Sequence, residues 1–265
     1  MTFELLVSTM HKKNMQEIQD MLIRMNVMCD CIIVNQCDEE TVFVEKNNTQ
    51  KILAIFTKER GLSKSRNMAL KNSSADIVAI ADDDLYYYDN FDKIIVDYYK
   101  KNTQAEVVLF GIDSYRKICD KKEQKCNFLK LGSYISVQTS LKRMNILQRN
   151  ISFNDLFGTG SGCYDSGEEN IFLADCYKKK LNLFYCPEKI LRDDETESSW
   201  FKGYTEKFCR DRGAIFYAIS PLLSNLFIFA FAFMKRKLLK PITFFEASKL
   251  MLEEKKHYIS ILQKV

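Results

Sequence analysis

The sequence predicts an α/β protein with a mostly parallel central sheet, helices on both faces of the sheet and a helical tail at the C-terminal end. Short apolar runs rich in Val, Ile and Leu recur along the first two thirds of the chain, which is typical of buried strands. Segments with helical periodicity separate these runs, as in parallel sheets built from strand–helix–strand units. The tail is apolar and then basic.

The strands and helices follow one another in a regular order. Strands are expected at residues 3–8, 29–35, 51–56, 76–81, 105–112 and 181–186. Helices are expected at 14–25, after the stretch 61–70, and at 91–101, 166–180 and 198–213. No repeat or low-complexity linker divides this pattern. We therefore expect one catalytic domain over residues 1–213 and a tail over residues 214–265.

Composition and charge exclude several classes of protein. The 265 residues carry a formal net charge of only +4, which does not indicate a nucleic-acid partner. Residues 235–265 hold eight Lys and Arg against three Glu, so the basic character belongs to the tail. The nine cysteines form no Cys-x-x-Cys pair and only His11 and His257 accompany them, which argues against structural zinc. No charged and then apolar leader opens the sequence, and free thiols in a reducing cytoplasm are expected.

Three aspartates stand where the apolar run 76–81 ends, in the stretch "IVAIADDDLYYYDNF". Like charges side by side repel one another, so a cation is expected among Asp82, Asp83 and Asp84. In extended chain Asp82 and Asp84 point the same way and suit Mg²⁺ or Mn²⁺, with a diphosphate completing the coordination. The alternative is a solvated acidic turn. An EF-hand loop is excluded because Tyr87 stands at its glycine position, and no Walker-type phosphate loop is present.

Two further stretches carry polar groups at expected helix N-termini. "GLSKSRN" offers Gly61, Ser65 and Arg66 to a diphosphate or nucleoside, unless a serine merely caps the helix and Arg66 is a surface charge. "SGEEN" offers Glu168 and Glu169 as general bases. Its alternative is a capping box formed by Ser166 and Glu169.

In this order and spacing, "GLSKSRN", "AIADDD", "SGEEN" and "LNLFYCPE" resemble the motifs of family 2 glycosyltransferases, over roughly residues 3–215. The segment "SSWFKGYTEKFCRDRGA" is also similar to bacterial members. The resemblance implies the nucleotide-sugar-binding GT-A fold, with the C-terminal helical tail added to it.

The resemblance also implies a mechanism. A nucleotide diphospho-sugar, with a UDP-sugar as the expected donor, would bind at the carboxyl ends of the strands. Asp84, with Asp82, would hold Mn²⁺ or Mg²⁺, and Glu169 or Glu168 would deprotonate a hydroxyl of a glycan or lipid-linked acceptor, which inverts the anomeric centre. The residues expected to hold the nucleotide are Ser8, Thr9, Asn35, Gly61, Ser65, Arg66, Asp82 and Asp83. The product would be a surface polysaccharide.

The chain departs from the family pattern at three points. The usual base is Asp, whereas position 169 is Glu, so Glu168 remains an alternative. The segment "VNQCDEE" offers Asn35, Gln36 and Asp38 where many relatives carry an aspartate that reads the nucleobase. A late metal-binding histidine has no counterpart, and Asp193 and Asp194 stand instead. The rival hypotheses are a sugar nucleotidyltransferase and a degenerate nucleotide-sugar-binding protein without turnover.

The tail carries no charge from Ala214 to Met234 and then reads "KRK". A spanning helix would place the nucleotide-sugar domain outside the cell, so we expect an interfacial helix on the inner face of the membrane, over 214–240. Packing within the domain and an oligomer contact are the alternatives.

Overall fold

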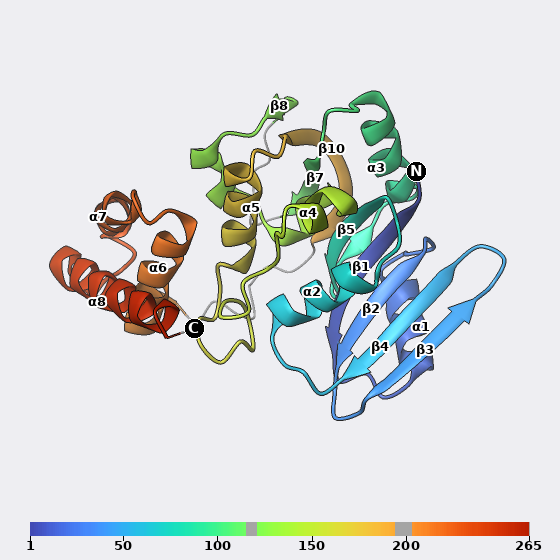
Figure 1. Ribbon diagram of the computed structural model, residues 1–265, viewed down its shortest axis with the longest axis horizontal. Helices are drawn as coiled ribbons and strands as arrows, with labels where there is room; N and C mark the ends of the chain where they lie inside the picture. The colour runs from blue at the N-terminus through green and yellow to red at the C-terminus, as the bar shows by residue number, and fades with distance from the viewer. Residues whose placement is uncertain (115–120, 194–202, 265) are drawn as a thin grey trace.

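The computed structural model describes residues 1–114, 121–193 and 203–264, and within them the centre is one ten-stranded sheet (Figure 1). The strand order is β3-β4-β2-β1-β5-β9-β7-β10-β6, and β8 pairs with β10 off this path. The strands are β1 (Phe3–Met10), β2 (Cys31–Gln36), β3 (Thr41–Lys46), β4 (Lys51–Thr57), β5 (Ile77–Asp82), β6 (Tyr86–Tyr87), β7 (Val107–Ser114), β8 (Gln124–Lys125), β9 (Thr139–Lys142) and β10 (Leu183–Asp193). The α-helices are α1 (Met15–Arg24), α2 (Leu62–Asn72), α3 (Phe91–Lys101), α4 (Arg143–Gln148), α5 (Glu168–Lys178), α6 (Glu206–Ile219), α7 (Ser224–Lys235) and α8 (Phe244–Leu262), and two 3₁₀ turns cover Phe128–Ser133 and Ser136–Gln138.

The α/β prediction is confirmed, and the sheet is mixed. Strands β4, β2, β1 and β5 run parallel, as expected from their apolar sequences. Strand β9 runs antiparallel between β5 and β7, and β3 and β6 are antiparallel to their neighbours. In the parallel part Ser8 lies opposite Asp82, so β1 and β5 end at the same edge of the sheet.

Helices cover both faces of the sheet, and the alternation of side chains along β1 shows how. Leu5 and Val7 point into a core shared with α1 and α3. Leu6, between them, points into the opposite core, shared with α2, α4 and α5. Burial on both faces explains why the strands read as continuous apolar runs.

Two helices differ from the sequence prediction in where they begin. Helix α2 starts at Leu62, inside the stretch that was expected to precede it, so Ser63 and Ser65 lie within the helix and do not cap it. The last expected helix begins at Glu206, with Thr205 as the N-cap, and residues 198–202 lie outside the described ranges.

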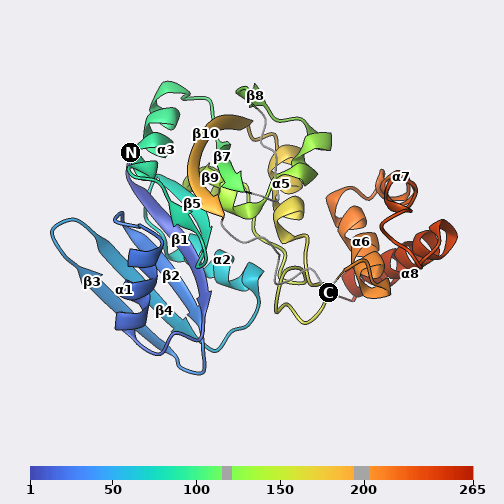
Figure 2. The ribbon, with the colours of Figure 1, turned by 180° about the vertical axis from the view of Figure 1, so that it is seen from behind.

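Helices α6, α7 and α8 form a separate layer at the end of the molecule away from β3 and β4, next to α5 (Figures 1 and 2). Helices α6 and α8 cross closely at Gly213, where an added Cβ would lie 2.0 Å from the carbonyl oxygen of Met251. Helix α6 runs unbroken through residues 213 and 214, so the expected domain boundary falls inside a helix. The division into domains stays a prediction. Among the described residues, no helix has both the length and the apolar content to cross a membrane.

Candidate active site

Two adjoining cavities open at the carboxyl ends of β1 and β5. The larger has a volume of about 500 Å³ and the smaller about 220 Å³. Asp82 and Asp84 line both cavities, together with Leu62 and Thr159. The sequence prediction that the aspartates lie where ligands bind in such sheets therefore agrees with the geometry.

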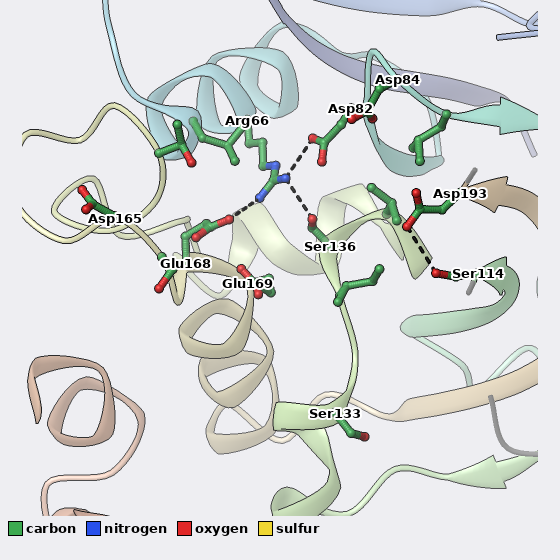
Figure 3. A pocket seen from close by; sticks show the side chains of 16 residues that line it. Arg66, Asp82, Asp84, Ser114, Ser133, Ser136, Asp165, Glu168, Glu169 and Asp193 are labelled. Atoms are coloured by element: carbon green, nitrogen blue, oxygen red, sulfur yellow. Dashed lines mark hydrogen bonds and ion pairs between the residues drawn. The ribbon is translucent and has the colours of Figure 1, made fainter. Parts of the chain in front are cut away.

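Arg66 lines the larger cavity and binds three other side chains that line it (Figure 3). Its Nη2 donates to Oδ1 of Asp82 at 3.0 Å and to Oγ of Ser136 at 2.9 Å, and its Nη1 donates to Oε1 of Glu168 at 3.0 Å. The guanidinium is fully buried, so the alternative of a surface charge is wrong. Although burial opposes the charge, the carboxylates of Asp82, Glu168 and Glu169 raise the pKa of Arg66.

Glu168 and Glu169 lie side by side in the first turn of α5 and line the larger cavity (Figure 3). Burial, and then the charge of Glu169, raises the pKa of Glu168 to about 8, while Arg66 acts in the opposite direction. The buried carboxyl of Glu168 therefore keeps its proton to higher pH than an exposed glutamate does. The N-cap of α5 is Gly167 and no side chain caps it, so the capping box expected from Ser166 does not form.

The smaller cavity is lined by Ser8, Thr9, Gly61 and Asp83, all predicted to hold a nucleotide. Asp83 accepts a hydrogen bond from the Thr9 hydroxyl and lies 3.1 Å from the Lys12 ammonium. The amide of Gly61 donates to Oε1 of Gln36 at 2.7 Å, which fixes the start of α2.

Two residues predicted for the nucleotide site line neither cavity. The Ser65 hydroxyl donates to Oγ of Ser8 at 2.8 Å, so Ser65 contacts a residue of the smaller cavity without lining the cavity itself. Both amide atoms of Asn35 bind the backbone of Lys12, at 2.7 and 3.0 Å, so this side chain holds the β1–α1 loop.

Asp82 and Asp84 offer some, but not all, of the ligands that a hard cation needs. Asp82 and Asp84 offer oxygen ligands facing both cavities, the chemistry that Mg²⁺ and Mn²⁺ prefer. Over residues 1–114, 121–193 and 203–264, no three His, Cys, Asp or Glu side chains gather closely enough to hold a metal ion. The donor set therefore fits a cation that takes its remaining oxygens from a bound diphosphate. Asp193 lines the larger cavity and accepts a hydrogen bond from the Ser114 hydroxyl at 3.3 Å. Asp194 lies outside the described ranges.

The sequence reasoning did not single out Ser136, Thr159, Lys12 or Arg60, which all contact or line the site. Arg60 directly precedes "GLSKSRN" and could have been included with it. Of the three tyrosines that follow the aspartates, Tyr87 is fully buried against Phe91, with ring centres 4.2 Å apart, and Tyr86 and Tyr88 are partly buried.

Comparison with known proteins identifies the family. Residues 27–163, just over half of the chain, match Glycosyl transferase family 2. This match includes Arg66 and the three aspartates and ends before Glu168. A comparison with curated protein sequences finds no match.

The fold is similar to crystal structures of residues 1–349 of S. aureus TarS. The structure in complex with UDP-GlcNAc aligns with a TM-score of 0.62 and 15% identity, over 98% of this chain and 79% of that one. The structure in complex with UDP aligns with a TM-score of 0.61 and 13% identity, over 100% of this chain and 92% of that one. The likeness confirms the GT-A-type fold implied by the sequence motifs. The chain therefore belongs to glycosyl transferase family 2 and is a glycosyltransferase.

Proposed function

We propose that the enzyme transfers a sugar from a nucleotide diphospho-sugar to an acceptor hydroxyl, with inversion and with a divalent metal ion. One observation carries this proposal: the two cavities meet at Asp82 and Asp84, and the larger also contains Glu168 and Glu169. A donor lying across this wall would put its nucleoside in the smaller cavity and its sugar in the larger, beside the candidate bases.

The smaller cavity suits a nucleoside diphosphate. Ser8 and Thr9 bring hydroxyls to it at the end of β1, and Arg60, which is paired with Asp38, lines the same cavity. Support for a uridine nucleotide comes from S. aureus TarS, whose structures hold UDP-GlcNAc and UDP. The role expected for Arg66 changes in this proposal. Because its two terminal nitrogens bind Asp82, Glu168 and Ser136, Arg66 positions the carboxylates and does not bind the nucleotide.

We assign the general base to Glu169 and a positioning role to Glu168, whose carboxylate is held by Arg66. A carboxylate oxygen of Glu169 accepts the proton of the acceptor hydroxyl. The acceptor oxygen forms a bond to the anomeric carbon from the face opposite the leaving group. The bond from that carbon to the diphosphate oxygen breaks, and the nucleoside diphosphate leaves with the electron pair.

Asp82 and Asp84 are the residues that would hold Mn²⁺ or Mg²⁺. When bound, such a cation neutralises the charge that develops on the leaving diphosphate. Asp82 also accepts a hydrogen bond from Arg66, which orients its carboxylate.

The acceptor proposed is a hydroxyl of a glycan or of a lipid-linked glycan, as in surface polysaccharide synthesis. In the proposal the acceptor enters the larger cavity, whose volume of about 500 Å³ lies within the range of small-molecule sites. The reaction is placed in the cytoplasm, where nucleotide sugars are available. The eight cysteines in the described ranges are all free thiols, which is consistent with a reducing compartment.

The test is release of nucleotide from a panel of nucleotide sugars in the presence of Mn²⁺. Wild type is compared with Asp84→Ala and with Asp97→Ala, an exposed aspartate on α3 that serves as the control. Release that Asp84→Ala abolishes and Asp97→Ala preserves supports the proposal. Tight binding without release by wild type would favour the degenerate binding protein, and pyrophosphate-dependent formation of a nucleoside triphosphate would favour a nucleotidyltransferase.

A further inference from the structure

Helix α7 turns apolar side chains outward as well as inward. Its inner face buries Ile228 and Ala232 against α6 and α8. On its outer face Leu226 is 63% exposed, Phe229 45% and Phe233 59%. These three positions are spaced three and four residues apart, so they share one face of the helix.

Neighbouring residues extend this face. Leu222 precedes the helix and is 96% exposed, and Met234 follows Phe233 and is also exposed. We call the set the apolar stripe: Leu222, Leu226, Phe229, Phe233 and Met234. Single exposed apolar residues are ordinary, but five large ones within thirteen consecutive residues, four of them on α7, indicate a contact surface.

The chain segment that carries the stripe holds charge of one sign only. Residues 214–245 contain no Asp or Glu, and Lys235, Arg236, Lys237 and Lys240 follow the stripe directly. The Arg236 guanidinium lies over the ring of Phe233, 4.3 Å from its centre, so cationic and apolar groups form one continuous surface.

We propose that the apolar stripe and these four basic residues bind the enzyme to an anionic lipid bilayer, with α7 lying in the interface. Apolar side chains would enter the acyl boundary while the Lys and Arg side chains meet the headgroups. Helix α7 has 12 residues, a length of roughly 18 Å, whereas a bilayer core measures roughly 30 Å, so it lies on the membrane and does not span it.

The charge pattern favours a bilayer over a second copy of the chain. A symmetric dimer through the stripe would supply no opposite charge to the four cations of each copy, because each copy presents the same surface. Residues 214–245 supply no carboxylate to neutralise them. An anionic bilayer supplies both the apolar phase and the opposite charge. This inference does not depend on which sugar or acceptor the enzyme uses.

The test is co-sedimentation of the full chain with vesicles of phosphatidylcholine alone or mixed with phosphatidylglycerol. The double variant Phe229→Glu/Phe233→Glu is compared with Val42→Glu/Val44→Glu, whose valines on edge strand β3 are 60% and 63% exposed. We expect wild type to bind the mixed vesicles more tightly. The stripe variant should lose affinity about tenfold or more, because two aromatic side chains no longer enter the acyl boundary and two carboxylates face the anionic headgroups, and the β3 variant should bind as wild type does. All substituted side chains are exposed, so thermal unfolding should confirm that both variants fold.

A third variant, Lys235→Gln/Arg236→Gln/Lys237→Gln, should lose the preference for phosphatidylglycerol and the sensitivity to salt. The proposal is overturned if wild type binds neither kind of vesicle, or if the stripe and β3 variants lose binding equally. It is also overturned if sedimentation velocity shows a dimer that Phe229→Glu/Phe233→Glu dissociates while wild type ignores vesicles, since the stripe would then be a contact between copies.

Discussion

Nη1 of Arg66 lies 3.0 Å from Oε1 of Glu168, and the two residues, 102 positions apart in the chain, are both buried. Through its other terminal nitrogen, Arg66 also binds Asp82. One guanidinium therefore connects the strand that carries the candidate metal ligands to the helix that carries the candidate bases. The placement of the candidate metal ligands relative to the candidate bases depends on Arg66, because its planar guanidinium binds a carboxylate from each set.

We expect Arg66→Met to destabilise the fold by roughly 3–5 kcal/mol, because it leaves the carboxylates of Asp82 and Glu168 without their buried cation. Arg66→Lys keeps the charge but lacks the fork, so it should also lose stability. Urea unfolding measures both. Arg24→Met, at an exposed arginine in the last turn of α1, should change the free energy of unfolding by at most about 0.5 kcal/mol. Equal losses at Arg24 and Arg66 would contradict the central role of the buried ion pairs.

Substitution of the two glutamates separates the base from its neighbour. Glu169→Gln should lower turnover about 10²–10⁴-fold, the usual contribution of a general base, with little change in donor affinity. Glu168→Gln should retain measurable turnover, because the carboxylate of Glu169 is still present to accept the proton of the acceptor hydroxyl. Stopped assays of sugar transfer measure the turnover of both variants. If Glu168→Gln is the inactive variant and Glu169→Gln keeps wild-type turnover, the roles are reversed.

The raised pKa of Glu168 predicts how stability changes with pH. Burial and Glu169 hold this pKa at about 8 in the folded chain, against an ordinary value of 4.5. Between these values the folded state keeps a proton that the unfolded state releases, so stability falls as pH rises from about 4.5 to about 8. Glu168→Gln should flatten this slope in urea titrations between pH 5 and 8. A slope unchanged by Glu168→Gln would show that Arg66 keeps the carboxylate ionised throughout.

Much of the fold could be predicted from local sequence. The strands β1, β4 and β5 follow apolar runs, and α3 has the predicted bounds of 91–101 because its apolar period is clear. Strand β9 was not predicted. It has only four residues, and its pairing with β5 and β7 is decided by segments distant in the chain. Strand β3 was missed for a related reason, since it lies at the edge of the sheet and pairs with β4 alone, and one side of it is exposed.

The sequence predicted which residues belong to the site better than it predicted how they contact one another. The aspartate cluster and the glutamate pair were identifiable because such carboxylates need a cation or a chemical role. Nothing in the local sequence shows that Arg66 is buried between Asp82 and Glu168, or that Asn35 is used to hold the Lys12 backbone. Those contacts come from tertiary packing, which puts α2, β5 and α5 at one edge of the sheet.

Gly167 fixes the approach of the base-bearing helix to α6, and it offers a test of that packing. It has a φ of +96°, and an added Cβ would lie 2.6 Å from Cδ1 and Cγ1 of Ile215. Gly162 has a φ of +80° with nothing within 4 Å of an added Cβ, so it is a matched control for backbone strain alone. Gly162→Ala should cost about 1 kcal/mol of unfolding free energy. Gly167→Ala should cost about 1–3 kcal/mol more, because Ile215 must move.

The overlap itself can be isolated in a double-mutant cycle. In an Ile215→Ala background, Gly167→Ala should cost about as much as Gly162→Ala does in wild type, since only the strain of the positive φ remains. Turnover should fall in Gly167→Ala more than in Gly162→Ala, because Glu168 and Glu169 follow Gly167 directly and move with it. Identical unfolding free energies for Gly167→Ala and Gly162→Ala would mean that α6 does not set the position of the first turn of α5, and that the helical layer contributes nothing to the alignment of the base.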